Sequence, residues 1–249
     1  MIEDLLLSDR SLREVRPEIH SALSPEAEKA TYDTRAERYD QVVGSWWYNR
    51  LIWGVSTERY RRFVRRALGA GEGPFLDAGA GSAVFTAEAY AQSSRPLILI
   101  DRSVGMLEAA RNRIAMRAGG SLPDRIMLLQ ADATDVPLER GSVETVLSMA
   151  LFHIIEDLAP LAEELFRVLR PGGLLFATSL VTERAVGRLY LRLLHKAGEM
   201  ATPRTQEELR DRLDSALDRP VGIQREGNMA FLNAEKPSRS QGTAANRDE

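Results

Sequence analysis

The chain has 249 residues, of which 44% are hydrophobic and 28% charged, and its net charge at pH 7 is −3. This balance is ordinary for a globular chain and excludes the strongly basic surface that recruits nucleic acid. The sequence contains no cysteine, which excludes disulfides and thiolate metal sites. The start MIEDLLLSDR lacks the positive charge of a signal peptide, and the longest apolar runs are too short to cross a membrane. We therefore expect a cytoplasmic protein without a bound metal.

The first 68 residues are predicted to form a helical cap that acts as a substrate lid. Residues 1–24 read as a loose arm or a short helix. Ser24 and Pro25 are typical of a helix start, and helical character continues through YDTRAERYDQVV at 32–43. A second helix is predicted over TERYRRFVRRAL at 57–68. Two readings fit its five arginines, a phosphate-binding patch and a solvated helix face; the apolar residues interleaved at helical period favour the second.

From residue 69 to 236 the pattern predicts a Rossmann-like core. Short apolar strands are expected at 74–78, 95–101, 125–132, 143–150 and 172–180, and helices between them at 84–92, 104–118 and 158–169. Alternation of buried strands with helices predicts a parallel sheet with right-handed crossovers.

After residue 180 a helix is expected over 183–198, within a substrate-side insertion at 181–205. A second helix opens at Thr205 with Glu208 three residues on, which is a capping-box pattern. Two strands within 220–235 form a hairpin at the sheet edge. The predicted fold class is therefore α/β: a doubly wound, mostly parallel seven-stranded sheet with helices on both faces and a C-terminal antiparallel hairpin. Residues 237–249 are expected to form a disordered tail.

The stretch LDAGAGSA at 76–83 is a glycine-rich loop between a predicted strand and a predicted helix. Gly79 and Gly81 fit the first two glycines of a dinucleotide loop, but the third position is Val84. Asp77 also opposes a diphosphate, because two like charges repel by about 4 kcal/mol at about 4 Å in an effective dielectric near 20. The loop instead suits a ligand that carries a positive group, such as an amine or a sulfonium.

Two further acids stand at predicted strand ends. Asp101 closes LILID, about 20 residues beyond Gly81, where a carboxylate can bind ribose hydroxyls. Asp132 follows RIMLLQ and is placed to accept from an adenine amino group. Taken singly, the glycines fit an ordinary turn, Asp101 a helix cap and Asp132 a loop acid. Taken together at successive strand ends, they predict a site for a nucleoside with a cationic tail.

In order and spacing, FLDAGAGSA, LILIDRSVGML, LLQADATDVPL, VETVLSMALFHII and LRPGGLLF resemble the motifs of class I S-adenosylmethionine-dependent methyltransferases. The resemblance covers residues 31–180. YDTRAERYDQVV also resembles the helix that precedes the core in the ubiquinone/menaquinone methyltransferase-like branch, where it commonly covers the cofactor. This resemblance implies S-adenosyl-L-methionine as the cofactor.

The resemblance further implies a cofactor site at the strand ends, with one contribution from the preceding helix. The glycine loop would hold the methionine moiety with Asp77 near its ammonium group, Asp101 would bind the ribose hydroxyls, and Asp132 would meet the adenine edge. Arg102 and Met106 would flank the adenine. The implied set is Tyr39, Asp77, Ala78, Gly79, Gly81, Asp101, Arg102, Met106, Asp132, Ala133 and Ser148.

The sequence departs from the family pattern at two places. Ala83 replaces the third small residue of the first motif, usually glycine, a change that a tight helix start tolerates. Val143-Glu144 replaces the usual Phe-Asp before the fourth strand, which is expected to affect packing more than chemistry.

His153, just after the fourth strand, is the candidate general base, because methyl acceptors of this family lie near that loop and histidine titrates near neutral pH. The alternative is a structural or pocket-lining histidine. Trp46 and Trp47 are candidate substrate residues within GSWWYNRLIWG. Their alternatives are packing of a helix against the core, or a dimer contact.

The sequence therefore predicts methyl transfer to the O, C or N atom of a small molecule, with an aromatic or quinone-like acceptor favoured. The alternatives are a nicotinamide-dependent oxidoreductase, disfavoured by Asp77 and Val84, and a non-catalytic cofactor-binding module. Nucleic acid is not expected as a partner, and a homodimer stays open.

Overall fold

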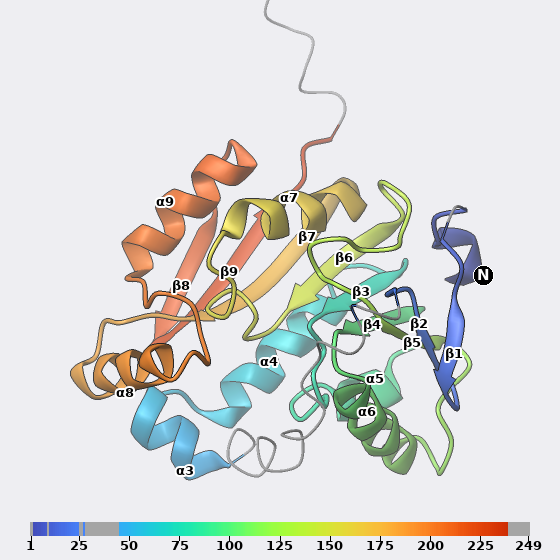
Figure 1. Ribbon diagram of the computed structural model, residues 1–249, viewed down its shortest axis with the longest axis horizontal. Coiled ribbons are helices and arrows are strands. Elements are labelled where there is room, and N and C mark those ends of the chain that lie inside the picture. The colour runs from blue at the N-terminus through green and yellow to red at the C-terminus, as the bar shows by residue number, and fades with distance from the viewer. Residues whose placement is uncertain (1, 9, 25–26, 28–44, 239–249) are drawn as a thin grey trace, which may run out of the picture.

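The computed structural model describes residues 2–8, 10–24, 27 and 45–238, and its core is one twisted sheet (Figure 1). Within the described residues the sheet has nine strands in the order β1-β2-β5-β4-β3-β6-β7-β9-β8. The five central strands are parallel to one another and buried between helices: β3 (Phe75–Ala78), β4 (Leu97–Asp101), β5 (Ile126–Gln130), β6 (Val143–Ser148) and β7 (Leu169–Leu180).

The C-terminal hairpin is confirmed. Strands β8 (Gly222–Glu226) and β9 (Met229–Glu235) pair antiparallel, and β9 pairs antiparallel with β7. The α/β class and the seven strands expected from the sequence are therefore present.

The N-terminal residues add two strands that the sequence did not predict. After a 3-10 helix, η1 (Ile2–Leu5), β1 (Arg13–Arg16) pairs antiparallel with β2 (Ile19–Ser21), which pairs in parallel with β5. The expectation of a loose arm or a short helix is thus wrong over 13–21. These strands are too short to show an alternating pattern, and the partner of β2 lies more than a hundred residues away, so only tertiary contact specifies them.

The helix expected over 32–43, with Tyr39, lies outside the described residues, as does the tail beyond 238. At its predicted start, the Ser24 hydroxyl accepts a hydrogen bond from Ala27 N at 3.3 Å, as an N-cap does.

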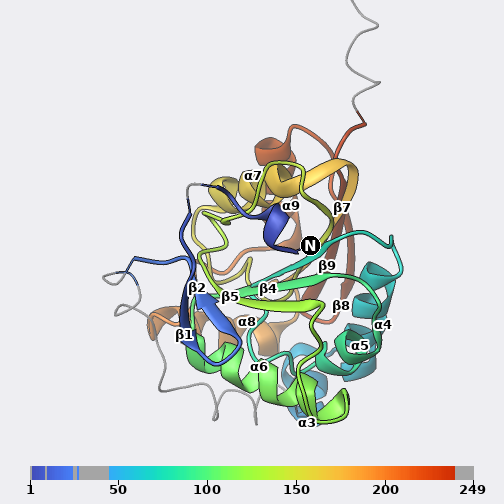
Figure 2. The same cartoon turned by 90° about the vertical axis from the view of Figure 1, so that its right-hand side faces the viewer.

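Helices cover both faces of the sheet (Figures 1 and 2). One face carries α7 (Leu158–Val168) and α9 (Gln206–Leu217). The other carries α4 (Thr57–Leu68), α5 (Ala87–Gln92), α6 (Val104–Arg117) and α8 (Ala185–Lys196), with the short α3 (Trp46–Tyr48) and the π-helical η2 (Asn49–Trp53) beside α8. The capping box of α9 is present, with Thr205 and Glu208 hydrogen-bonded reciprocally.

Strand alternation decides which way the site residues point. Along β3, Leu76 and Ala78 pack toward α7 and α9, whereas Phe75 packs toward α5. Because side chains alternate with a period of two, Asp77 lies on the same side as Phe75 and faces α5. The carboxylate is therefore directed into the helix layer behind the glycine loop.

Candidate cofactor and acceptor site

The glycine loop follows β3 directly and leaves one side open. Gly79 and Gly81 have φ of +75° and +54°, a left-handed conformation that favours glycine. The backbone N–H groups of Gly79 and Ala80 both donate to Ile100 O at 2.9 Å, which ties the loop to β4. A Cβ added to Gly81 would meet no atom within 4 Å, whereas one added to Gly79 would lie 3.2 Å from Leu151 Cδ2. The loop thus leaves space for a ligand at Gly81.

Ala83 also has a left-handed backbone, with φ of +56°, and is buried. Its carbonyl accepts hydrogen bonds from Thr86 N and Ala87 N at the start of α5. A non-glycine residue pays about 1–2 kcal/mol for this conformation. The replacement of glycine noted in the sequence is therefore accommodated by local strain.

Asp77 is 1% exposed, and its two oxygens have different environments. Oδ2 accepts a hydrogen bond of 2.6 Å from the Tyr90 hydroxyl of α5. Oδ1 has no hydrogen-bond partner among the described residues. Burial raises the pKa of Asp77 to about 7, with the Tyr90 hydrogen bond acting against this rise and the charge of Asp101 adding to it. A positive group at the loop would complement this unpartnered carboxylate.

Asp101 connects the glycine loop to the next crossover. Its Oδ2 accepts from Gly81 N at 2.8 Å and its Oδ1 from Ser103 N at 2.9 Å. Ser103 is the N-cap of α6 and accepts from Met106 N. Burial raises the pKa of Asp101, against the hydrogen bonds from these backbone groups. A carboxylate offers about four lone-pair sites, so Asp101 keeps acceptor capacity for ligand hydroxyls.

Asp132 lies two residues beyond the end of β5, whose last residue, Gln130, pairs with Asp101 of β4. Its Oδ1 accepts from both the backbone N and the hydroxyl of Thr134, at 2.9 and 2.7 Å. Its Oδ2 lies 3.4 Å from Arg102 Nη1. Gln130 holds this arrangement, because its amide donates to Arg102 O at 2.9 Å. The fold therefore brings Arg102 and Asp132 together, with Met106 in the adjacent first turn of α6 and Ala133 beside Asp132.

Ser148 is fully buried at the end of β6, and its hydroxyl donates to Ala78 O at 2.9 Å. Ala78 is also fully buried. This hydrogen bond joins the end of β6 to the end of β3, directly before the glycine loop.

His153 lies in the loop between β6 and α7 and is 8% exposed. Its Nδ1 accepts from Leu180 N at 3.4 Å, at the end of β7. Burial, with a smaller contribution from the charge of Arg204, lowers the pKa of His153 to about 4. A neutral imidazole that accepts at Nδ1 carries its proton on Nε2 and donates there. These features favour the alternative left open by the sequence, a structural or pocket-lining histidine; the general-base role stays a prediction.

The tryptophan-rich segment packs against α8. Trp47 is 48% exposed and makes an edge contact with Tyr48 at 6.0 Å between ring centroids. Tyr48 and Trp53 each make edge contacts with Tyr190 of α8, at 6.1 and 5.5 Å. Trp46 belongs to α3, but its side chain lies outside the described part of the chain. The cluster therefore joins two elements predicted to line the acceptor side.

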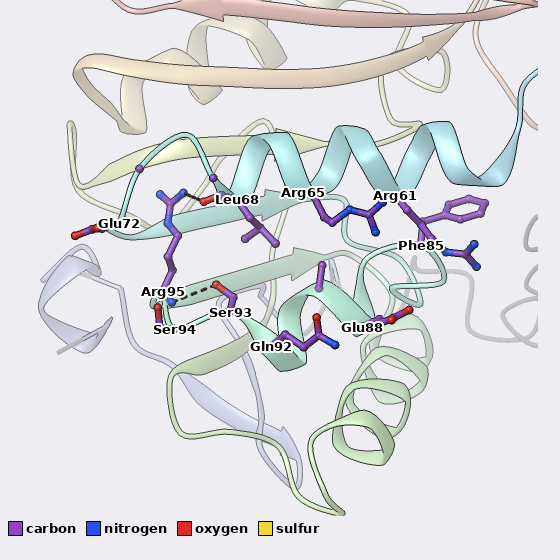
Figure 3. A pocket seen from close by; sticks show the side chains of 13 residues that line it. Arg61, Arg65, Leu68, Glu72, Phe85, Glu88, Gln92, Ser93, Ser94 and Arg95 are labelled. Carbon is purple, nitrogen blue, oxygen red and sulfur yellow. Dashed lines mark hydrogen bonds between the residues drawn. The ribbon is translucent and has the colours of Figure 1, made fainter.

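A pocket of about 350 Å³ lies between α4 and α5, away from the carboxyl ends of the strands (Figure 3). Arg65 on its wall pairs with Glu58 of its own helix. At its far end the Arg95 guanidinium donates to the carbonyls of Gly73 and Leu68, which fixes the ends opposite to the glycine loop. The ion pair of Arg65 within its own helix is in keeping with a solvated helix face, and Arg95, which lies outside that helix, has a structural role.

Among the described residues no cluster of His, Asp and Glu side chains is placed to bind a metal ion. None of the described helices is long and apolar enough to cross a membrane.

Comparisons with known proteins agree with this geometry. The family described as "Methyltransferase domain" matches residues 76–177. Demethylmenaquinone methyltransferase from Mycobacterium sp. (strain KMS) is 35% identical over 179 residues, covering 70% of this chain and 69% of the relative.

Two solved structures share the fold. Phosphoethanolamine N-methyltransferase 2 from Haemonchus contortus, bound to phosphomonomethylethanolamine and S-adenosylhomocysteine, has a TM-score of 0.64 at 16% identity, covering 87% of this chain and 61% of that one. A SAM-dependent methyltransferase from Thermotoga maritima has a TM-score of 0.56 at 19% identity, covering 81% of this chain and 99% of that one.

The fold, the motif set and these comparisons define an S-adenosylmethionine-dependent methyltransferase. The chain belongs to the class I S-adenosylmethionine-dependent methyltransferase family, in its ubiquinone/menaquinone methyltransferase-like branch. This membership overturns the nicotinamide-dependent oxidoreductase considered above.

Three residues that contact the site residues or the tryptophan-rich segment, Tyr90, Leu151 and Tyr190, were not predicted from the sequence. Tyr90 was assigned only to a helix, although a buried tyrosine hydroxyl requires a hydrogen-bond partner. Leu151 and Tyr190 carry no sequence signal, because their roles depend on contacts between distant segments.

Proposed function

We propose that the glycine loop and the three acids bind S-adenosylmethionine in the orientation implied by the family motifs. Two features support this assignment: the open space at Gly81 and the buried, unpartnered Oδ1 of Asp77. In this proposal Asp77 supplies negative charge near the ammonium group, and Asp101 accepts from the ribose hydroxyls. Arg102, Met106, Asp132 and Ala133 surround the adenine.

The bound cofactor supplies a methyl group that is already activated by the positive sulfur. The chain's own residues therefore act by orientation, close approach and exclusion of water. Gly79 and Gly81 allow close approach of the backbone, and Ser148 fixes the strand end beneath the loop through Ala78 O. No protein group has to activate the leaving sulfur.

We further propose an aromatic or quinone-like ring as the acceptor. The observation that carries this proposal is an aromatic cluster formed by Tyr48 of α3, Trp53 of η2 and Tyr190 of α8. The name of the 35% identical relative, a demethylmenaquinone methyltransferase, supports the same acceptor class. Residues up to 68 and the insertion at 181–205 would form the two walls of the acceptor site, with Trp46 and Trp47 in the first of them.

His153 is proposed to orient the acceptor by donating from Nε2. Its lowered pKa of about 4 makes it a weak base at neutral pH. A ring hydroxyl or enolate oxygen of the methyl acceptor would be a suitable hydrogen-bond partner. The proton that the methyl acceptor loses would pass to solvent or to another basic group. The cytoplasmic location expected from the sequence stays part of this proposal.

Turnover with a panel of acceptors tests the acceptor class. The full chain would be incubated with S-adenosylmethionine and a naphthoquinol that lacks its ring methyl, a simple catechol, or a primary amine. We expect S-adenosylhomocysteine and a methylated ring with the naphthoquinol, and slower turnover with the catechol. Methylation of the amine alone would refute the aromatic acceptor. If no acceptor is methylated, cofactor binding measured by calorimetry shows that the preparation is active in binding and that the acceptor class is refuted.

A further inference from the structure

Exposed apolar side chains of the described residues are concentrated on two neighbouring elements. Of seven large apolar side chains that are exposed, five lie on α3, η2 and α8, with exposed fractions between 48% and 66%. We define the α3–α8 face by these five residues: Trp47, Leu51, Val186, Leu189 and Leu193. A cluster of this kind on a water-facing surface commonly marks an interaction site.

The α3–α8 face is continuous. Val186, Leu189 and Leu193 are spaced three and four residues apart and therefore form one stripe along α8. α8 contacts η2, and Tyr190 of α8 packs on Tyr48, the neighbour of Trp47. The two elements lie side by side in Figure 1.

The rim of this face is positively charged. Residues 46–53 and 185–196 contain no Asp or Glu, and they carry Arg50, Arg188, Arg192 and Lys196. All four side chains are exposed. Within the described chain none of the three on α8 forms an ion pair. The whole sequence has a net charge of −3, so the face carries an excess of positive charge that the chain as a whole lacks.

We propose that the α3–α8 face docks on the headgroup layer of a lipid bilayer that contains anionic lipids. The apolar stripe and Trp47 would enter the interface, and the arginines and lysine would contact lipid phosphates. A second copy of the chain is a poorer occupant, because a two-fold contact through this face would set the basic rims against each other. Lipid with negative headgroups complements both features.

Docking would also place the carboxyl ends of the strands near the membrane. α8 begins five residues after β7 ends, and the Leu180 N–H at that end donates to His153. Attachment does not depend on which acceptor is methylated, so lipid binding and turnover can fail separately.

Co-sedimentation with vesicles tests the proposal with the full chain. We expect the protein to sediment with vesicles of phosphatidylglycerol and phosphatidylcholine, to sediment weakly with phosphatidylcholine alone, and to be released by high salt. Each basic residue near an anionic surface should contribute about fivefold to partitioning. Failure to sediment with the anionic vesicles would refute the proposal.

Paired variants locate the contact. Leu189→Gln with Leu193→Gln, and Arg188→Gln with Arg192→Gln, should each lower partitioning at least tenfold. Met116→Gln with Arg117→Gln is the matched control, because these residues are exposed on α6, which lies far from α8 in Figure 1. The control should bind lipid as the parent chain does.

Two other outcomes would overturn the assignment. An equal loss in the control pair would mean that binding is not located on this face. Dimerisation without lipid, abolished by Leu189→Gln with Leu193→Gln in light scattering, would identify the face as a self-association surface. Unchanged thermal unfolding and cofactor binding of each variant would show that the fold is intact.

Discussion

Tyr90 donates a hydrogen bond of 2.6 Å to Asp77 from the helix layer behind the glycine loop, and both side chains are almost completely buried. The pair joins the first strand of the parallel core to the helix that follows its loop. It leaves Oδ1 of the carboxylate without a hydrogen bond from the described residues. The residue that precedes the loop on β3 is therefore a buried carboxyl group with only one of its two oxygens hydrogen-bonded.

Tyr90→Phe should lower the free energy of unfolding by about 2 kcal/mol near pH 8, because it removes a hydrogen bond to an ionised carboxylate. Urea unfolding would measure this change. The matched control is the same substitution in an Asp77→Asn background, where the loss should be about half as large. An equal loss in both backgrounds would show that the Tyr90 hydroxyl does not act through the charge of Asp77.

Asp77 should make stability depend on pH. Its pKa is raised from 3.8 to about 7 in the folded protein, so the native state holds a proton that the unfolded chain has released. Stability should therefore fall as pH rises from about 4 to about 7, by up to about 4 kcal/mol relative to Asp77→Asn. Unfolding of both proteins across this range gives the difference. A difference that is constant with pH would contradict the assignment.

Cofactor affinity should rise with pH over the upper part of the same range. The proposed ammonium group favours ionised Asp77, so binding should release a proton and become tighter between about pH 5.5 and about pH 7. Calorimetry in buffers of different ionisation enthalpy would detect the proton. Asp77→Asn should bind at least tenfold more weakly, about 1.4 kcal/mol, and should lose the pH dependence.

The two loop glycines should respond differently to alanine. Both have a left-handed backbone, so each substitution should cost about 1 kcal/mol of stability. Gly79→Ala should cost more, because its Cβ would lie 3.2 Å from Leu151 Cδ2. Gly81→Ala meets open space and should mainly weaken cofactor binding. Thermal unfolding and binding constants for both variants would test the contrast, and equal effects on both quantities would refute it.

His153→Gln separates orientation from proton transfer. If His153 orients the acceptor, KM for the acceptor should rise and kcat should stay within about threefold, whereas loss of a general base would lower kcat by about 10²–10⁴-fold.

Because the folded pKa of His153 is about 4, below the unfolded value of 6.5, the parent chain should lose up to about 3 kcal/mol of stability relative to the variant as pH falls from 6.5 to about 4. If the kcat of the parent chain depends on one ionisation near neutral pH, and this pH dependence is lost in the variant, His153 would be the general base.

Local patterns were sufficient where a segment's neighbours in sequence decide its structure. The helix over 57–68, the Thr205 capping box and the continuous apolar runs of the core strands were predicted within a few residues. These features depend on helix periodicity, on side-chain hydrogen bonds to nearby backbone, and on burial of whole strands, all of which can be read along the chain. The acids at 77, 101 and 132 likewise follow from strand ends and spacing.

What the sequence by itself determined is the class of fold and the order of its core strands along the chain, and from these it predicted the residues proposed for the cofactor site. Tertiary structure alone decided the β1–β2 addition to the sheet edge, the Tyr90 partner of Asp77, the tautomer favoured at His153 and the contact of η2 with α8. Each of these joins segments that are separated along the chain, or depends on solvent exclusion by several elements at once. Pairing energy between distant residues and burial of a charge exist only once the chain is folded, so no local pattern encodes them.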